Sequence, residues 1–136
     1  MRTPRLLVLV LAGFLLTSCA TATRAQRSEF EDIPVPKGLS YVEQRSTIIE
    51  SPSVKAARLV YRGRIEPTSL AVAMRTTLEA NGWRSVSATS NGAIGTTQVY
   101  EKGGNSLQVR LWEGWYYTYV ELTASRALTA TPQAAR

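Results

Sequence analysis

The chain has 136 residues, with 16 Lys and Arg against 10 Asp and Glu, a single Cys and no His. This length suits one small domain with one hydrophobic core. The lack of His excludes Ser-His-Asp and Cys-His catalysis, the usual His-containing zinc sites and the commonest general base. A lone Cys cannot form a disulfide within the chain.

The first residues are typical of an export signal. Arg2 and Arg5 give a short basic start, and an almost unbroken apolar run follows from Leu6 to Leu16. A secretory signal needs an apolar stretch of about 7–15 residues, whereas a membrane-spanning helix needs about 20. We therefore expect residues 1–18 to be a cleaved signal peptide that does not belong to the mature fold.

The segment Leu16-Thr17-Ser18-Cys19 looks like the lipobox of bacterial lipoprotein precursors. In that system the Cys thiol takes a diacylglyceryl group, the peptidase cuts before the Cys, and the new amino group is often acylated. The resemblance implies that Leu16, Thr17 and Ser18 are recognised by the signal peptidase and that Cys19 is lipidated. Two or three acyl chains give the stable anchoring that one chain does not. The alternative is an ordinary secretory signal with a chance Cys.

The residue after Cys19 is Ala20. In Gram-negative lipoproteins an Asp at this position commonly means retention at the inner membrane, so the resemblance implies an outer-membrane protein that faces the periplasm. Loss of Arg2 and Arg5 would leave 14 Lys and Arg against 10 acidic residues, a net charge of about +4. This mild positive charge suits anionic envelope surfaces and is too diffuse to indicate nucleic-acid binding.

Composition divides the mature chain into three parts. Residues 19–38 are predicted to be a lipidated tether, because Ile33-Pro34-Val35-Pro36 favours an extended chain. Residues 39–126 are predicted to form an α+β domain. Residues 127–136 contain mostly Ala, Thr, Pro and Gln without an apolar period, which predicts a disordered tail.

The first half of the domain is predicted to hold two strands and a helix. Alternating apolar and polar residues indicate strands at Tyr41–Ile49 and Val54–Ile65, joined by a turn. The period then changes, and Pro67 to Asn81 is predicted to be an amphipathic helix with Leu70, Met74, Thr77 and Leu78 on one stripe.

The second half of the domain is predicted to be a run of four short strands that begins at Trp83. The strong turn signals lie at Asn91-Gly92, Gly103-Gly104 and Glu113-Gly114. The expected order is β-β-α-β-β-β-β, an antiparallel sheet with one amphipathic helix packed on one face.

Two-residue turns at these three positions fix a register for the strands. Trp83 would face Tyr100, Tyr100 would face Leu107, and Leu107 would face Val120. The same side collects further apolar residues, at Val109, Leu111, Tyr116 and Leu122. A coherent apolar face emerges from turn chemistry alone, which supports the register.

The opposite side of the last hairpin would carry aromatic and basic side chains. The register places Trp112 across from Trp115 and Arg110 across from Tyr117. The candidate binding surface comprises Arg110, Trp112, Trp115, Tyr117 and Tyr119, with Arg58, Arg62 and Arg64 from the earlier strand. Exposed aromatic patches tend to mark binding surfaces, and Arg pairs with phosphate or carboxylate in a bidentate way.

Two other interpretations of this row remain open. Cross-strand aromatic pairs stabilise hairpins by about 0.2–1 kcal/mol each without any ligand. The tether or another subunit could also cover the row. The carboxylates are scattered, with no pair placed in one cleft by sequence spacing, so we predict no catalytic residues, no metal, no cofactor and no enzymatic activity.

Several short motifs together resemble a class of small, functionally uncharacterised Gram-negative lipoproteins. They are the lipobox, the segment from Asp32 to Gly38, Tyr61-x-Gly63 and Asn81-Gly82-Trp83. The helix followed by a meander is also similar to the helix-grip modules of outer-membrane assembly lipoproteins. Neither resemblance implies an activity or catalytic residues.

The residues and the resemblance together predict a membrane-anchored periplasmic lipoprotein, a non-enzymatic binding or scaffolding module of the cell envelope. The alternative is an accessory subunit of an outer-membrane or envelope assembly complex. The expected partners are the membrane, through the lipid anchor, and an envelope protein or anionic envelope polymer, with no nucleic acid.

Overall fold

The computed structural model describes residues 30 and 32–127. The chain divides into two units, Met1–Asp32 and Ile33–Arg136, and the fold described below lies in the second. The predicted signal peptide, the lipobox with Cys19 and the tail beyond Ala127 lie outside the described residues. Within the described part of the chain, no helix combines the length and the apolar character that a membrane crossing requires.

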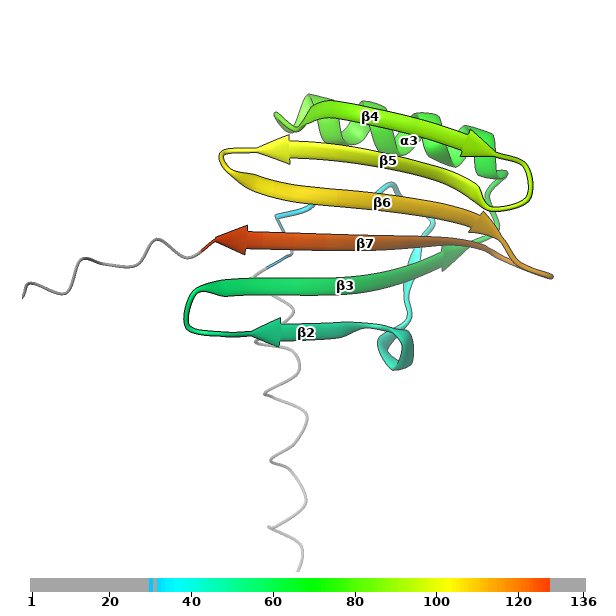
Figure 1. The fold of residues 1–136 in the computed structure, drawn as a ribbon. Coiled ribbons are helices and arrows are strands. Elements are labelled where there is room, and N and C mark those ends of the chain that lie inside the picture. Colours follow the sequence, from blue (N-terminus) through cyan, green and yellow to red (C-terminus); the bar gives the residue numbers. More distant parts are fainter. Residues whose placement is uncertain (1–29, 31, 128–136) are drawn as a thin grey trace, which may run out of the picture. The chain divides into compact units, whose positions relative to one another are not determined.

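The domain is built on a seven-stranded antiparallel sheet (Figure 1). Its strands are β1 (Ser40–Tyr41), β2 (Thr47–Glu50), β3 (Val54–Gly63), β4 (Arg84–Asn91), β5 (Gly95–Lys102), β6 (Asn105–Glu113) and β7 (Thr118–Ala127). The order across the sheet is β1-β3-β7-β6-β5-β4, and β2 also pairs with β3. One edge is therefore shared by β1 and β2, and the other edge is β4.

One helix, α3 (Pro67–Ala80), crosses one face of this sheet. The strands β3 and β4 run in the same direction with β7, β6 and β5 between them, so their connection has to pass over a face. Leu70, Met74 and Leu78 of the predicted stripe are completely buried and Thr77 is partly buried, whereas Val72 on the other side of the helix is 62% exposed. The predicted helix and its packing on one face of an α+β sheet are confirmed.

The strand residues beneath α3 complete the core. They are all of one parity along each strand: Ala57, Leu59, Tyr61, Tyr100, Leu107, Val109, Leu111, Val120, Leu122 and Ala124. A buried polar chain also ties the helix to β5. The Gln98 amide nitrogen donates to the Ala71 carbonyl at 3.0 Å, and the Tyr100 hydroxyl donates to the Gln98 amide oxygen at 2.8 Å. Burial raises the pKa of Tyr100.

The start of α3 is fixed by Glu66. Its carboxylate accepts hydrogen bonds from the backbone N–H groups of Ser69, at 2.7 Å, and Thr68, at 2.8 Å. These bonds satisfy two of the N–H groups that a helix leaves unpaired at its first turn. They lower the pKa of Glu66 to about 2, so this side chain stays ionised at neutral pH.

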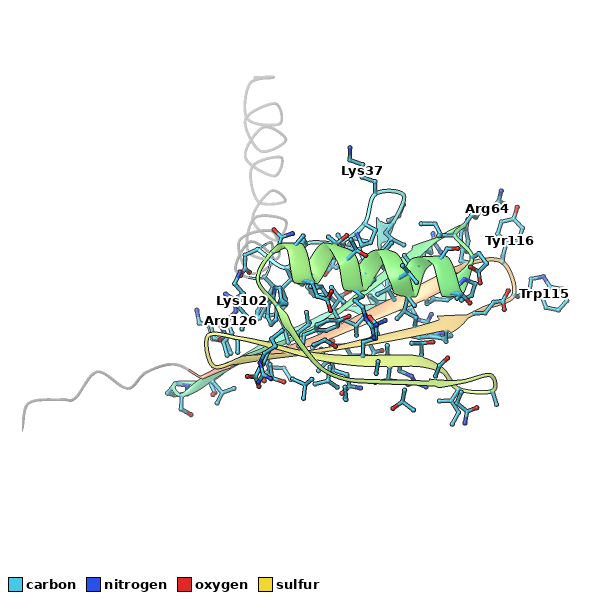
Figure 2. The ribbon with its side chains drawn as sticks, turned by 90° about the horizontal axis from the view of Figure 1, so that it is seen from above. Lys37, Arg64, Lys102, Trp115, Tyr116 and Arg126 are labelled. Atoms are coloured by element: carbon cyan, nitrogen blue, oxygen red, sulfur yellow. The ribbon has the colours of Figure 1, made fainter. Side chains whose placement is uncertain are left out.

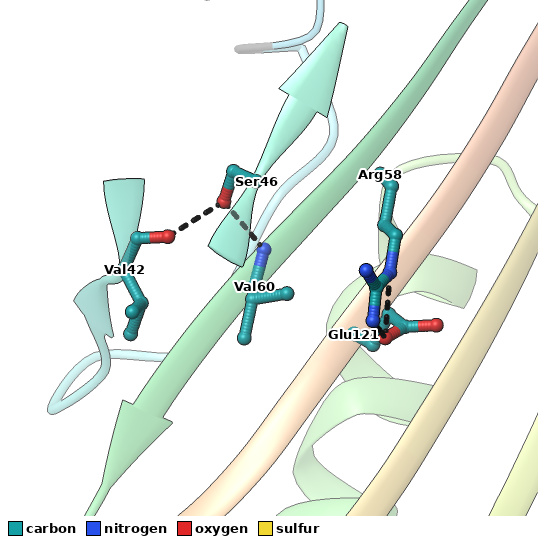
Figure 3. Close-up of polar contacts among 5 residues, drawn as sticks. All are labelled: Val42, Ser46, Arg58, Val60 and Glu121. Atoms are coloured by element: carbon teal, nitrogen blue, oxygen red, sulfur yellow. Dashed lines mark hydrogen bonds and ion pairs between the residues drawn. The ribbon is translucent and has the colours of Figure 1, made fainter. Parts of the chain in front are cut away.

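The first predicted strand is wrong in one respect. The range Tyr41–Ile49 is divided into β1, a short 3-10 helix, η2 (Glu43–Arg45), and β2. Figure 3 shows why this interruption is tolerated. The Ser46 hydroxyl accepts a hydrogen bond from the Val60 N–H at 2.9 Å and donates one to the Val42 carbonyl at 2.8 Å. The Ser46 side chain thus satisfies the Val60 N–H of β3 at a point where the pairing with β1 and β2 is interrupted.

The register is confirmed at one of the three turns. Gly103-Gly104 is a two-residue turn, and Tyr100 pairs with Leu107 as predicted. The turn after β4 is longer, since Asn91 pairs with Gly95 around a three-residue loop. A bulge between Ser85 and Ser87 shifts the pairing again, and Ser85 rather than Trp83 lies opposite Tyr100.

The loop between β6 and β7 is also longer than expected. It contains four residues, Gly114 to Tyr117, so Leu107 pairs with Ala124 instead of Val120. This displacement is four positions along β7. Because side chains alternate between faces with a period of two, an even displacement leaves Val120 and Leu122 on the buried face. The predicted apolar face is therefore correct there although the predicted pairs are wrong; Tyr116, which was expected on it, is 61% exposed.

The longer turn after β4 depends on glycine at its last position. Gly95 has a φ of 95°, and a Cβ atom there would collide with the carbonyl oxygen of Leu111. Gly92, in the same loop, has open space around it. We expect Gly95→Ala to reduce the free energy of unfolding by about 2 kcal/mol or more, through a strained backbone and a broken strand pair.

Urea unfolding of the protein measures this difference. Gly92→Ala is the matched control, for which we expect a change within about 0.5–1 kcal/mol. Equal effects of the two substitutions would contradict the close approach of Gly95 to β6.

Candidate binding face

The face of the sheet opposite α3 carries basic and aromatic side chains. Figure 2 shows the helix on one side of the sheet and strand side chains projecting from the other. The outward residues of the three central strands are Arg58, Val60 and Arg62 of β3, Gln108, Arg110 and Trp112 of β6, and Tyr119, Glu121 and Thr123 of β7. These side chains are exposed or partly exposed, except that of Val60, which is only 1% exposed.

A row of stacked side chains crosses this face near the end of β6 and the start of β7. Trp112 and Tyr119 are directly paired in the register, and their rings stack with 5.5 Å between centroids and 12° between planes. Arg110 lies over the Trp112 ring at 5.5 Å, and Arg45 lies over the Tyr119 ring at 5.0 Å. The row therefore ends in a guanidinium group on each side.

A second stacked group lies where the loop between β6 and β7 folds back. Arg62 is 4.8 Å from the Tyr117 ring, and Arg64 is 4.0 Å from the Tyr116 ring. The two tyrosine rings meet edge to face at 5.1 Å. Gly114 permits the fold-back, because a Cβ atom there would come within 2.7 Å of the Tyr119 ring.

We call these two groups together the arginine–aromatic face. It consists of Arg45, Arg62, Arg64, Arg110, Trp112, Tyr116, Tyr117 and Tyr119. Among the described residues, none of its four arginines is ion-paired with a carboxylate. Arg58 differs, because it donates from Nε at 2.9 Å and from a terminal nitrogen at 2.6 Å to one oxygen of Glu121. These bonds raise the pKa of Arg58.

The structure gathers most of the surface that the sequence predicts. Six of its residues lie on the arginine–aromatic face: Arg62, Arg64, Arg110, Trp112, Tyr117 and Tyr119. Arg58 lies on the same side of the sheet but is ion-paired with Glu121. Trp115 stands on the loop with its side chain fully exposed, at 102%.

The predicted pairs within this surface are wrong. Trp112 lies opposite Tyr119 rather than Trp115, and Arg110 lies opposite Glu121 rather than Tyr117. The cause is the four-residue loop, which removes Trp115 and Tyr117 from the strands altogether.

Two residues of the face, Arg45 and Tyr116, are not predicted from the sequence. Tyr116 was expected on the buried side, and Arg45 was placed in a continuous strand. A signal for Arg45 did exist, because Glu43-Gln44-Arg45 breaks the alternation between apolar and polar residues. Three consecutive polar residues favour an interruption of a half-buried strand.

A hollow of about 680 Å³ adjoins the face at the end of β6. It is lined by Arg110, Trp112 and Glu113, by the loop after β4, and by the start of α3 with Glu66. Ligand sites commonly have volumes of about 300–1,000 Å³. The hollow is thus large enough for a small part of an extended polymer, with a guanidinium and an indole on its wall.

The hollow also brings together two carboxylates that sequence spacing keeps apart. Glu66 and Glu113 both line it, contrary to the expectation that no pair shares a cleft. The Glu66 carboxylate is already bound by N–H groups of α3, and with a pKa of about 2 it cannot supply a proton at neutral pH. Among the described residues, no three His, Cys, Asp or Glu side chains are grouped to hold a metal ion.

Comparisons with known proteins give little further information. No protein-family model matches the chain, and no curated protein matches it. Among solved structures, the chain is similar to LpqN, involved in cell envelope biogenesis of Mycobacterium tuberculosis. The identity is 16%, the TM-score is 0.39, and the match covers 71% of this chain and 70% of that chain. A similarity this low supports no conclusion about function.

Ser46 connects this face to the fold, because its hydroxyl holds the chain next to η2 and η2 supplies Arg45. We expect Ser46→Ala to lower the free energy of unfolding by about 1–3 kcal/mol, since it leaves the Val60 N–H without its partner and removes one of the two hydrogen bonds that the Val42 carbonyl accepts. Chemical denaturation measures the loss. Ser106→Ala, at an exposed position of β6, is the control and should change stability by less than about 0.5 kcal/mol. Similar changes in the free energy of unfolding for both variants would show that the Ser46 hydroxyl does not stabilise the fold.

Proposed function

We propose that this chain is an exported lipoprotein, anchored to a membrane through Cys19, whose arginine–aromatic face binds an anionic polysaccharide of the cell envelope without catalysing a reaction. The observation that carries this proposal is the set of four guanidinium groups that stack on aromatic rings, three on the side of the sheet away from α3 and one, Arg64, at its loop end. The lipobox and the basic, apolar start of the chain support the export and the anchor.

Stacking leaves the arginines ready to bind an anion. A guanidinium group that lies on a ring uses its flat face for the contact, while its N–H donors point outward in the plane of the group. These donors match the spacing of two oxygens on a phosphate or carboxylate. Since Arg45, Arg62 and Arg110 have no carboxylate partner among the described residues, a ligand anion would meet charges that are not yet neutralised.

The aromatic rings favour a ligand that also contains sugar rings. Trp112 is half-buried, with Tyr119 stacked on its ring and Arg110 over it, and it lines the hollow, so a sugar in the hollow would meet the accessible part of the indole beside a guanidinium group. Aromatic faces stack on the apolar faces of sugars. The predicted export favours an envelope polymer over a nucleic acid, for which arginines and aromatic rings would otherwise also be suitable.

Removing two charges from the face tests the proposed binding. We expect Arg62→Gln/Arg110→Gln to weaken binding of the mature chain to lipopolysaccharide about tenfold or more, because each arginine loses a charge-assisted contact. Co-sedimentation at about 50 mM and about 300 mM salt measures it, and the higher salt should weaken wild-type binding because it screens exposed charges.

The matched control is Arg84→Gln/Lys102→Gln, which removes the same charge elsewhere. Arg84 already pairs with Glu101, and Lys102 donates to the Asn81 carbonyl. This variant should bind almost as the wild type does, and neither protein should bind neutral dextran. Equal losses in both double variants, or a stoichiometric protein partner that co-purifies in place of the polymer, would contradict the proposal.

The anchor is tested separately by its thiol. We expect Cys19→Ser to abolish incorporation of labelled palmitate and to move the protein from the membrane fraction to the soluble fraction, because no thiol remains to accept the diacylglyceryl group. Pulse labelling and fractionation of cells measure both effects. Normal processing and continued membrane association of this variant would refute the lipoprotein assignment.

A further inference from the structure

We propose that one end of the sheet docks onto an anionic phospholipid bilayer, with Trp115 entering the interface between headgroups and acyl chains. This goes beyond the proposed function, because it assigns a different ligand to the loop end of the sheet, which borders the arginine–aromatic face and shares Arg64 and Tyr116 with it. The end in question carries two loops, residues 92–94 between β4 and β5 and residues 114–117 between β6 and β7. Figures 1 and 2 both show these loops at the same end of the domain.

Trp115 projects from a firmly held turn. The Gly114 N–H donates to the Tyr117 carbonyl at 2.8 Å and closes the loop, while Arg64 lies over the Tyr116 ring. Its neighbours are therefore fixed, but the Trp115 side chain is 102% exposed. Trp is usually buried in large part when a protein has no use for it at the surface. The loop thus holds the indole in water at the outermost point of this end of the domain.

The neighbouring loop presents a second apolar side chain. Ile94 is 58% exposed, and its N–H donates to the Asn91 carbonyl at 3.1 Å within the turn. The strands behind the two loops are in register, since Thr96 of β5 pairs with Leu111 of β6. Ile94 and Trp115 therefore project from the same edge of one rigid sheet and can enter a flat surface together.

The charges at this end suit an anionic surface. Arg64 lies beside the Trp115 loop, and Figure 2 shows Arg64, Tyr116 and Trp115 grouped at one end, with Lys102 and Arg126 at the other. The carboxylates of this end are Glu66 and Glu113, which line the hollow between the loops. Glu66 stays ionised, so these two carboxylates face three guanidinium groups at this end: Arg64, Arg62 over the Tyr117 ring, and Arg110 on the wall of the hollow. A basic side chain next to exposed aromatic residues is attracted to anionic headgroups.

The shape of this end favours a bilayer over a protein partner. A residue that dominates a protein interface commonly fills a pocket and is surrounded by contacts that exclude water. Trp115 and Ile94 instead stand on separate projecting loops. A bilayer accepts projections of this kind without a complementary pocket, and tryptophan and tyrosine concentrate at its interface. The occupant we assign is therefore the lipid surface itself.

Vesicle binding tests this docking without the anchor. The full mature chain, residues 19–136 with Cys19→Ser, is mixed with vesicles of phosphatidylcholine alone or with about 30% phosphatidylglycerol. We expect binding that is at least about fivefold tighter to the anionic vesicles, and quenching of tryptophan fluorescence by lipids brominated on the acyl chains. Trp115→Ala should weaken vesicle binding about tenfold and abolish the quenching.

The control is Ile49→Ala, which removes an apolar side chain of similar exposure from β2. This variant should bind and be quenched like the parent chain, and Ile94→Ala should show a smaller loss than Trp115→Ala. Trp115 makes no contact in the core, so unchanged urea unfolding identifies a true binding effect. Unaltered quenching in Trp115→Ala, equal losses in Ile49→Ala, or no binding to either vesicle would overturn the proposal. Because Cys19 is absent and no polysaccharide is present, failure here is separate from failure of the proposed function.

Discussion

The burial of α3 against one face of the sheet is the interaction on which the rest of this structure depends. The helix has one apolar stripe, formed by Leu70, Met74 and Leu78, and the crossover from β3 to β4 lays that stripe over the central strands. A single helix of 14 residues can cover only one side. The opposite side of the same strands therefore has to be stable in contact with water, and its side chains stack on one another instead of on a second layer.

The form of that stacking determines what the exposed side can do. Salt bridges such as the one between Arg58 and Glu121 would also satisfy surface arginines, but they cancel the charge. Contacts between guanidinium groups and rings hold the side chains in place at a favourable energy of about 0.5–1 kcal/mol each at exposed sites and leave the charge intact. The same contacts therefore hold the side chains of Arg45, Arg62 and Arg110 in place and leave their positive charges available to a ligand.

The sequence predicts which face of the sheet a residue lies on better than it predicts which residue it pairs with on the neighbouring strand. The helix, the α+β class and the division into buried and exposed residues follow from periodicity, which any local stretch of chain displays. Pairing depends on loop length, and the actual loops after Asn91 and Glu113 are longer than their turn residues suggest. The faces on which the residues of β6 and β7 lie were nevertheless predicted correctly, because the predicted pairing was displaced by an even number of residues. Arg45 was missed because its position is set by a hydroxyl group, Ser46, acting across 14 residues of chain on Val60.

The edge strand β4 has a consequence for molecules held close together. Its residues are all exposed or partly exposed, most are Ser, Thr, Asn or Arg, and the bulge at Val86 breaks the spacing of its backbone groups. A neighbouring copy that tried to extend the sheet would find hydrogen-bond donors and acceptors out of step at this bulge, with mostly polar side chains along the rest of the edge. Crowding many copies onto one surface would therefore leave them as separate molecules instead of a continuous fibre.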